Sequence, residues 1–179
     1  MTNLISLHNA LFHRIERADW LLPTLARATF VAVLFFYYWN SALLKIDGSV
    51  FSPSAGAFGQ IFPAAAEAVL WDVSKMSLFQ RLVITAGTLA EFVLPVLIMV
   101  GLLTRLAALG LIGFVAVQTL VDVTGHGVKL GSLFDSAQEL IDERAMWVFL
   151  LLVLVAKGAG PISVDRLIGR RAPSDSSEM

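Results

Sequence analysis

The segment LVITAGTLAEFVLPVLIMVGLL, from Leu82 to Leu103, sets the class of structure that this chain adopts. It is long enough to cross a bilayer, because a helix needs about 20 mostly apolar residues to span the hydrocarbon core. Its one ionisable side chain, Glu91, lies about 14 Å from the start of the segment at 1.5 Å per residue, close to the bilayer midplane. Pro95 cannot donate a hydrogen bond to the carbonyl group of Glu91, so we expect the helix to kink there.

Three further segments resemble membrane-crossing helices: Leu21 to Leu44, Leu106 to Val123, and roughly Ala137 to Ala156. The last is the weakest, because its apolar run begins only at Ala145 and a capping-box pattern, Ser136-Ala-Gln-Glu139, must extend it backwards. We therefore expect an all-α membrane protein built as a bundle of four transmembrane helices. Three spans plus an interfacial helix are the competing arrangement.

The composition agrees with a membrane protein and excludes several function classes. Of 179 residues, 57% are hydrophobic and 15% are charged, whereas soluble domains carry about 25% charged residues. Because the chain has no Cys, it has no disulfide, thiolate metal site or CxxC redox motif. Its net charge of -1 argues against a nucleic-acid partner, which would need a basic face.

The chain divides into three regions. Apolar residues from Leu4 to Ala18 recur at helical spacing, so residues 1–20 are expected to form an amphipathic helix that lies in the membrane interface or packs against the bundle. Residues 21–158 are expected to form the transmembrane domain, and residues 159–179 a cytoplasmic tail that is polar from Ala172 to Met179. The apolar loop between the first two spans is expected to hold a short helix starting at Pro63, which rests on the outer leaflet or caps the bundle.

The distribution of Lys and Arg sets the expected orientation. The positive-inside rule favours both termini in the cytoplasm, with the protein a multi-pass component of a bacterial inner membrane. In that orientation eight of the 13 basic residues lie inside, namely Arg14, Arg17, Arg27, Arg105, Lys157, Arg166, Arg170 and Arg171.

Glu91 requires a partner, because ionisable side chains at membrane depth usually face the interior of a bundle or a cavity. Arg27, on the first span, lies about 7 Å from Glu91 in height when both depths are counted from opposite faces of a roughly 30 Å core. We therefore expect a pair between the two. Two alternatives stay open: Arg27 extends to the inner headgroups, or Glu91 is protonated in apolar surroundings.

A second set of polar residues falls in the outer half of the spans. Gln118 and Asp122 are four residues apart on one helix face. We expect them to line a pocket open to the outer side together with Lys45, Tyr37, Tyr38 and Arg144, where carboxylates exchange protons and aromatic rings hold a flat molecule. An ordinary interfacial ion-pair cluster is the alternative. No metal site is expected, since Asp122 and His126 alone supply too few ligands.

The sequence is similar to the DoxX family of small four-helix membrane proteins over roughly Leu21 to Ile168. The resemblance rests on Arg27 and Lys45, on Ala90-Glu91, and on two motifs. These motifs are Gly101-Leu-Leu-Thr-Arg105-Leu-Ala-Ala108 and Gly158-Ala-Gly-Pro161-Ile-Ser-Val-Asp165-Arg-Leu-Ile. The chain departs from the family at Asn40 and Ser41, where a Gly is usual, and at Pro161.

This resemblance implies a subunit of a membrane oxidoreductase system, in which quinone takes part in electron transfer. A quinone needs an apolar slot, hydrogen-bond donors for its carbonyl groups and a route for protons. We therefore take Glu91, Arg27 and Lys45 as candidate catalytic residues, and Tyr37, Tyr38, Gln118, Asp122 and Arg144 as candidate cofactor-binding residues. The chain is expected to carry no redox cofactor of its own, so a periplasmic or membrane partner would supply one.

A second function from a different class also fits the sequence. The chain would then be a non-enzymatic scaffold or assembly subunit for a stress-response or metal-handling partner, recruited through the apolar outer loop, and the buried charges would fix helix registry. Either function places the protein in a lipid bilayer and is compatible with an oligomer.

Overall fold

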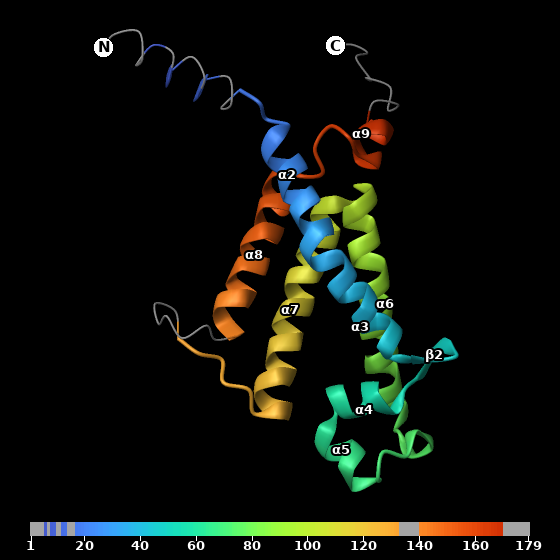
Figure 1. Cartoon of the computed structure of the whole chain (residues 1–179). Helices are drawn as coiled ribbons and strands as arrows, with labels where there is room; N and C mark the ends of the chain where they lie inside the picture. Colours follow the sequence, from blue (N-terminus) through green and yellow to red (C-terminus); the bar gives the residue numbers. More distant parts are fainter. Residues whose placement is uncertain (1–5, 7, 10–11, 14–16, 133–139, 170–179) are drawn as a thin grey trace, which may run out of the picture.

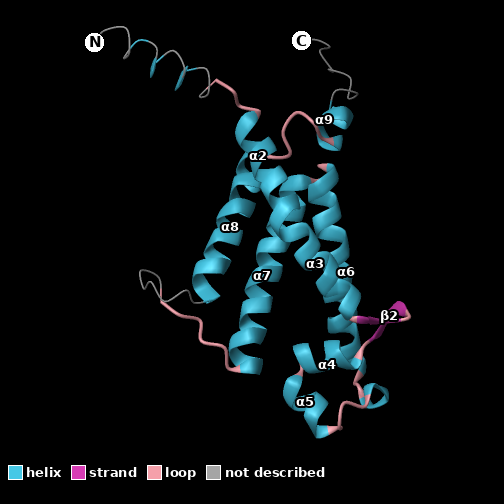
Figure 2. Ribbon diagram, in the orientation of Figure 1, coloured by secondary structure: helices cyan, strands magenta, loops and turns pink. Residues whose placement is uncertain are grey.

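The computed structural model describes residues 6, 8–9, 12–13, 17–132 and 140–169. Over these residues the chain is helical apart from one short hairpin (Figures 1 and 2). Three helices are long and apolar enough to cross a membrane: Leu21–Leu44, Leu78–Val100 and Thr104–His126. They correspond to three of the expected spans and indicate a membrane protein. Most of the expected helix at 1–20, the capping pattern from Ser136 to Glu139 and the end of the tail lie outside the described residues.

The first long helix consists of α2 (Leu21–Phe30), a π-helical turn η1 (Val31–Phe35) and α3 (Phe36–Leu44). Five of its buried residues recur at every fourth position: Ala26, Phe30, Leu34, Tyr38 and Ala42. In an ideal α-helix such a series would rotate by about 40° per step around the axis. The π-helical turn holds more residues per turn, which removes part of this rotation and keeps the series facing the bundle.

Helix α6 (Leu78–Val100) contains the segment that sets the class of structure. It begins ahead of the expected start because Ser77 and Gln80 form a reciprocal capping box, which satisfies two N–H groups at the helix start. Pro95 is buried inside α6 and does not end it. The helix stops at Gly101, whose φ of 73° lies in the left-handed region that favours glycine.

Helices α7 (Thr104–His126) and α8 (Leu140–Lys157) complete the packed core. Helix α7 packs between α6 and α8, while α2 contacts α8 and α3 contacts α6. A shared cluster of buried residues, including Phe30, Tyr38, Leu111 and Leu151, fills the space between these helices. Helix α7 continues to His126, beyond the expected end at Val123, and Gly127 caps it with a φ of 66°.

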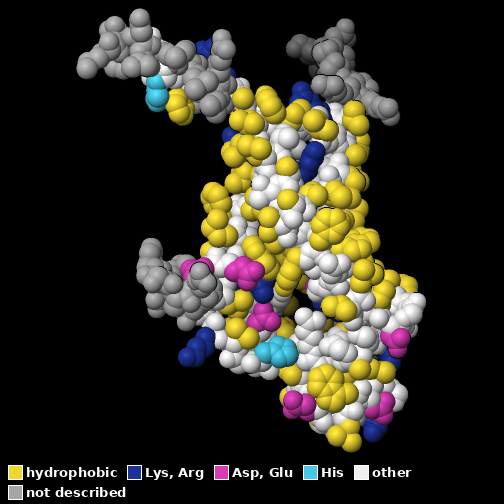
Figure 3. Space-filling view, viewed as in Figure 1, with side chains coloured by type: hydrophobic (Ala, Val, Ile, Leu, Met, Phe, Trp, Pro, Cys, Tyr) yellow, Lys and Arg dark blue, Asp and Glu magenta, His cyan; other side chains and the backbone are white. Residues whose placement is uncertain are grey.

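Hydrophobic side chains also cover the outward faces of the long helices (Figure 3). Large apolar residues such as Leu82, Leu106, Val117 and Leu120 are exposed, which in a water-soluble protein would be an unusually large apolar surface. Lipid contact accounts for this pattern. Charged side chains gather toward the lower end of the view, near α4 and α5.

The segment that joins the first two spans forms a compact cap. It contains β1 (Ile46–Asp47) and β2 (Ser49–Pro53), then α4 (Ala55–Ile61), α5 (Pro63–Ala68) and the short helix η2 (Val73–Lys75). Helix α5 starts at Pro63 as expected, whereas α4 and the hairpin were not anticipated. Phe58 and Ala66 are buried with Ile84 of α6 in a second cluster. The segment therefore caps the bundle, one of the two arrangements expected for it.

At the opposite end, two sequence motifs that are far apart in the chain meet. The carboxylate of Asp165, in α9 (Val164–Gly169), accepts hydrogen bonds from the backbone N–H groups of Leu103 at 2.7 Å and Thr104 at 3.1 Å. The backbone N–H of Asp165 in turn donates to the carbonyl oxygen of Gly101 at 2.9 Å. Asp165 thus satisfies N–H groups at the start of α7, which otherwise have no partner within the helix.

Candidate functional site

The central feature of the site is a buried ion pair between Lys45 and Glu91. Lys45 caps the C-terminal end of α3, and its Nζ lies 2.9 Å from Oε1 and 2.8 Å from Oε2 of Glu91 in α6. The two side chains are only 5% and 3% exposed. Because both oxygens face one ammonium group, Lys45 balances the charge of the carboxylate. Glu91 therefore faces a basic partner inside the bundle, as expected, and this partner is the amine of Lys45.

Ser41 completes this ion pair as a third member. It precedes Lys45 by one helical turn, and its Oγ accepts a hydrogen bond from Lys45 Nζ at 2.6 Å. The same hydroxyl group donates to Glu91 Oε1 at 3.1 Å. In the sequence, Ser41 stands out only as a departure from the DoxX family pattern. Its spacing from Lys45 was the available signal, since residues four apart share one helix face.

Arg27 does not pair with Glu91, which corrects the expectation from the sequence. Its guanidinium group donates to the carbonyl oxygens of Ala159, at 2.8 Å, and of Ile162, in the segment after α8. The heights of Arg27 and Glu91 in the bilayer follow from their positions in the sequence. The helix face on which Arg27 lies and the return of the C-terminal segment to α2 do not. Arg27 is therefore a structural residue that holds this segment.

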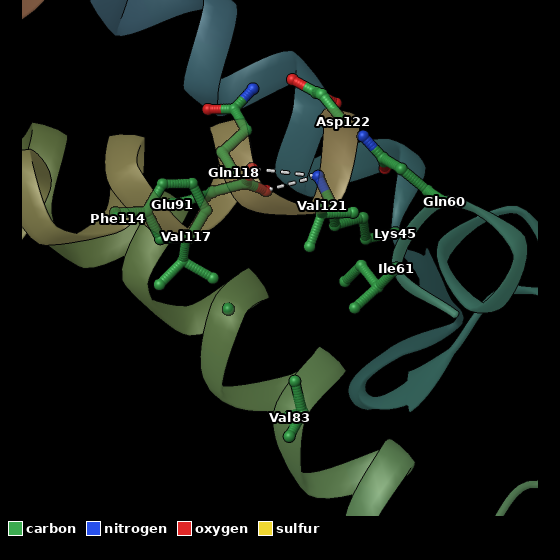
Figure 4. A pocket seen from close by; sticks show the side chains of 11 residues that line it. Lys45, Gln60, Ile61, Val83, Glu91, Phe114, Val117, Gln118, Val121 and Asp122 are labelled. Carbon is green, nitrogen blue, oxygen red and sulfur yellow. Dashed lines mark hydrogen bonds and ion pairs between the residues drawn. The ribbon is translucent and has the colours of Figure 1, made fainter. Parts of the chain in front are cut away.

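A cavity of about 90 Å³ lies beside the ion pair (Figure 4). We call it the Lys45–Glu91 cavity. Helix α6 contributes Val83, Gly87 and Glu91, helix α7 contributes Phe114, Val117, Gln118, Val121 and Asp122, and α4 contributes Gln60 and Ile61. Its surface is mostly apolar, with the polar atoms of a few side chains among aliphatic and aromatic groups. Ligand pockets commonly combine an apolar wall with a few placed polar groups in this way.

Gln118 and Asp122 both line this cavity, as their spacing predicts, and each leads to a further residue of the expected set. Gln118 Nε2 donates to the Tyr37 hydroxyl oxygen at 2.8 Å. Asp122 Oδ2 accepts a hydrogen bond from Arg144 Nη2 at 3.0 Å, and the Arg144 guanidinium lies 4.3 Å from the centre of the Trp147 ring. Tyr37 and Arg144 thus do not line the cavity but contact residues that do.

Tyr38 is fully buried, and its ring meets those of Phe114 and Trp147 edge to face. Among the described residues its hydroxyl group has no hydrogen-bond partner, and neither do Arg144 Nε and Nη1 or Gln118 Oε1. Buried polar atoms without partners are uncommon in native proteins. These atoms are concentrated between α3, α7 and α8, which marks this half of the protein as a place for a bound molecule or ordered water.

Several cavity residues had no place in the sequence-based site, among them Gly87 and Gln60. Gly87 lies four residues before Glu91 on α6 and opens space beside it, a position that helical spacing could have revealed. Gln60 enters from α4, a helix that the sequence did not predict. The carbonyl oxygen of Gln60 also lies 2.7 Å from His126 Nε2, which joins α4 to the end of α7.

The side chains of Asp122 and His126 contact Arg144 and the backbone of Gln60, respectively. Over the described part of the chain, no group of three or more His, Cys, Asp or Glu residues is placed to hold a metal ion.

Comparisons with known proteins give little further information. No family model matches the sequence, and no solved structure matches the chain. A protein of Haemophilus influenzae described as an uncharacterized protein is 30% identical over 87 residues, which cover 49% of this chain and 54% of that protein. The chain thus spans about half the length of the curated relative that it matches.

Proposed function

We propose that this protein is an integral membrane subunit that binds a membrane quinone in the Lys45–Glu91 cavity, as part of a quinone-linked oxidoreductase system. The observation that carries the proposal is a buried ion pair that borders a mostly apolar cavity. The likeness of the sequence to the DoxX family supports the same function. The proposal assigns the electron carrier to a partner protein.

The chemistry of the cavity suits a flat ring with polar groups at its ends. Phe114 and Val117 offer an apolar surface for the ring, and Gln118 offers a polar group for one end. Conversion between a quinone and its reduced form exchanges two protons, and the linked side chains of Glu91, Lys45 and Ser41 supply groups that can hold or transfer them. Arg27 has no part in this scheme.

The proposal includes α8 as a fourth span in a bacterial inner membrane, with both termini in the cytoplasm. Charged residues in α8 need not prevent insertion, because Arg144 is buried against Asp122 and Lys157 lies at the helix end. Arg105 and Arg166 lie at the end where α2 begins, opposite α4 and α5 (Figure 1). The positive-inside rule then favours that end in the cytoplasm, and the cavity lies toward the outer half.

Gly87 allows a test that leaves the ion pair untouched. A Cβ atom at this position would meet only Phe114 Cε2, at 3.9 Å, so a leucine side chain fits on the backbone but fills the cavity. Gly113, on α7, is exposed, and its Cβ would have no heavy atom within 4 Å, which makes Gly113→Leu a matched control. The ligands are duroquinone and its reduced form, durohydroquinone, titrated into the full-length protein in lipid nanodiscs.

We expect the wild-type protein and Gly113→Leu to bind at least one redox form of this ring, and Gly87→Leu to lose at least tenfold in affinity because leucine occupies the site. Glu91→Gln should reduce quinone-dependent turnover once a redox partner is supplied. If neither redox form binds the wild-type protein, or if Gly87→Leu and Gly113→Leu bind equally well, the proposed function is wrong.

The outer cap favours a second candidate function, that of a scaffold or assembly subunit. Leu70 is 87% exposed and Phe79 is 68% exposed, and Leu70 and Trp71 have positive φ angles of 54° and 63°, a conformation that non-glycine residues rarely adopt. Such strain often occurs at functional sites. In a scaffold, Leu70→Ser with Phe79→Ser would prevent assembly with the partner, whereas Glu91→Gln would leave assembly intact. The opposite result favours quinone binding.

A further inference from the structure

The hydrogen-bond donors of the ion pair next to the Lys45–Glu91 cavity are already engaged. A lysine ammonium group has three hydrogens, and Lys45 has three close acceptors: Glu91 Oε1 at 2.9 Å, Glu91 Oε2 at 2.8 Å and Ser41 Oγ at 2.6 Å. The Ser41 hydroxyl hydrogen is directed to Glu91 Oε1. Neither side chain has a hydrogen left for the carbonyl oxygen of a ligand unless the ion pair opens.

Acceptor atoms, in contrast, have capacity to spare. A carboxylate offers about four lone-pair sites, and the contacts of Glu91 within the described chain fill two on Oε1 and one on Oε2. Gln118 donates one of the two hydrogens of its Nε2 to Tyr37, and its buried Oε1 has no partner among the described residues. Asp122, a third lining residue, carries an acceptor-only carboxylate.

The spare charged donors of this region lie outside the cavity wall. Arg144 Nε and Nη1 have no hydrogen-bond partner in the described part of the chain, but Arg144 is not among the residues that line the cavity. Its Nη2 reaches Asp122 from the side of α8. Within the wall, the spare donors are the neutral amide groups of Gln60 and Gln118, whereas the charged groups with spare capacity, Glu91 and Asp122, are acceptors.

We propose that the cavity binds the reduced, dihydroxy form of the ring in preference to the oxidised, dicarbonyl form. This inference rests on the proposed function and names the redox form that the same site selects. A hydroquinone has two hydroxyl groups that donate hydrogen bonds, and the carboxylates of Glu91 and Asp122 are charged acceptors for them. A quinone has only acceptor oxygens, for which the wall offers the neutral amide groups of Gln60 and Gln118 and no free charged donor. Hydrogen bonds to charged groups are stronger than those between neutral groups.

The expected preference is about tenfold or more, since a hydrogen bond to a charged group strengthens binding by at least this factor. Preferential binding of the reduced form also makes the bound quinone easier to reduce. A tenfold preference raises the two-electron reduction potential of the bound couple by about 30 mV.

Three ligands that share one ring separate donor from acceptor character: durohydroquinone, duroquinone, and the dimethyl ether of durohydroquinone, which has the same oxygens without their hydrogens. Each is titrated anaerobically into the full-length protein in lipid nanodiscs. We expect durohydroquinone to bind about tenfold more tightly than the other two. Gly87→Leu should abolish binding of all three, and Gly113→Leu should preserve both affinity and preference.

Glu91→Gln tests the role of the carboxylate, since it removes the charged acceptor and should reduce the preference for durohydroquinone. Because this substitution also weakens the contact with Lys45, Gly87→Leu remains the test that does not depend on the ion pair. Equal or tighter binding of duroquinone overturns this inference and leaves the proposed function standing. If none of the three ligands binds, the proposed function and this inference both fail.

Discussion

Lys45 and Glu91 are 46 residues apart in the sequence, yet Lys45 Nζ lies 2.8 and 2.9 Å from the two carboxylate oxygens of Glu91. The contact joins the end of the first long helix to the middle of α6. The β1–β2 hairpin follows Lys45 directly. The ion pair therefore connects the inner part of the bundle to the cap formed by α4 and α5, and the cavity lies between them.

Removing one partner of the Lys45–Glu91 ion pair should lower the free energy of unfolding much more than removing both. Lys45→Met leaves the Glu91 carboxylate buried without a counter-charge, and breaking such a pair typically costs about 3–5 kcal/mol. The double variant Lys45→Met, Glu91→Leu replaces both charges with apolar groups, and its free energy of unfolding should stay closer to that of the wild type. The free energies of unfolding of the single and the double variant can be measured in mixed detergent micelles.

Lys75 provides the control for this experiment. Its contact with Asp72 spans 3.7 Å between side chains that are 62% and 42% exposed, and exposed pairs contribute about 0–1 kcal/mol. Lys75→Met should therefore change stability little. Equal losses for Lys45→Met and Lys75→Met would contradict a buried ion pair.

A double-mutant cycle distinguishes Lys45 from Arg27 as the partner of Glu91. Residues in direct contact show interaction energies of about 0.5–3 kcal/mol, whereas distant sites are additive within about 0.5 kcal/mol. We expect the effects of Lys45→Met and Glu91→Gln on the free energy of unfolding to be strongly non-additive. Arg27→Gln and Glu91→Gln should be additive, because Arg27 binds the carbonyl groups of Ala159 and Ile162. Strong coupling between Arg27 and Glu91 would instead restore the pairing expected from the sequence.

These two residues also mark the limit of prediction from sequence. Hydropathy located three of the four expected spans because the length of an apolar helix is a local property, and the cost of a charge in lipid identified Glu91. The partner of Glu91 depends on helix rotation, which the π-helical turn at Val31–Phe35 alters within the first span. Gln118 and Asp122 were placed correctly because four-residue spacing fixes a helix face. Gln60 was missed because nothing local indicated that α4 reaches the cavity.

Asp165 should stabilise the protein by capping α7. Its carboxylate accepts hydrogen bonds from the N–H groups of Leu103 and Thr104, and loss of a side-chain cap typically costs about 0.5–2 kcal/mol. Asp165→Ala should lower the free energy of unfolding by about this amount, while Asp165→Asn should retain part of the effect through its amide oxygen. Glu67→Ala, at an exposed position in α5, serves as the control. If Asp165→Ala leaves the free energy of unfolding unchanged, Asp165 does not stabilise α7 as a cap.

Gly59 should be required for the position of Trp71 in the outer cap. A Cβ atom on Gly59 would overlap the indole ring of Trp71. Gly59→Ala should therefore displace this ring and destabilise the cap, although alanine normally favours a helix by about 1 kcal/mol over glycine. Gly56→Ala, in the same helix, is the matched control, because its Cβ would lie 3.7 Å from Ser54 Oγ. Tryptophan fluorescence and proteolysis of the cap should change for Gly59→Ala alone.

The absence of Cys from the sequence permits a direct test of whether α8 crosses the membrane. Val128 and Ile168 are exposed residues on either side of α8, so single Val128→Cys and Ile168→Cys variants report the two ends of this helix. With four spans and both termini in the cytoplasm, a membrane-impermeant maleimide added to intact spheroplasts should label Val128→Cys. It should reach Ile168→Cys only after the membrane is permeabilised. If α8 instead lies in the interface, both positions will be labelled from the same side, and the cavity will belong to a three-span protein.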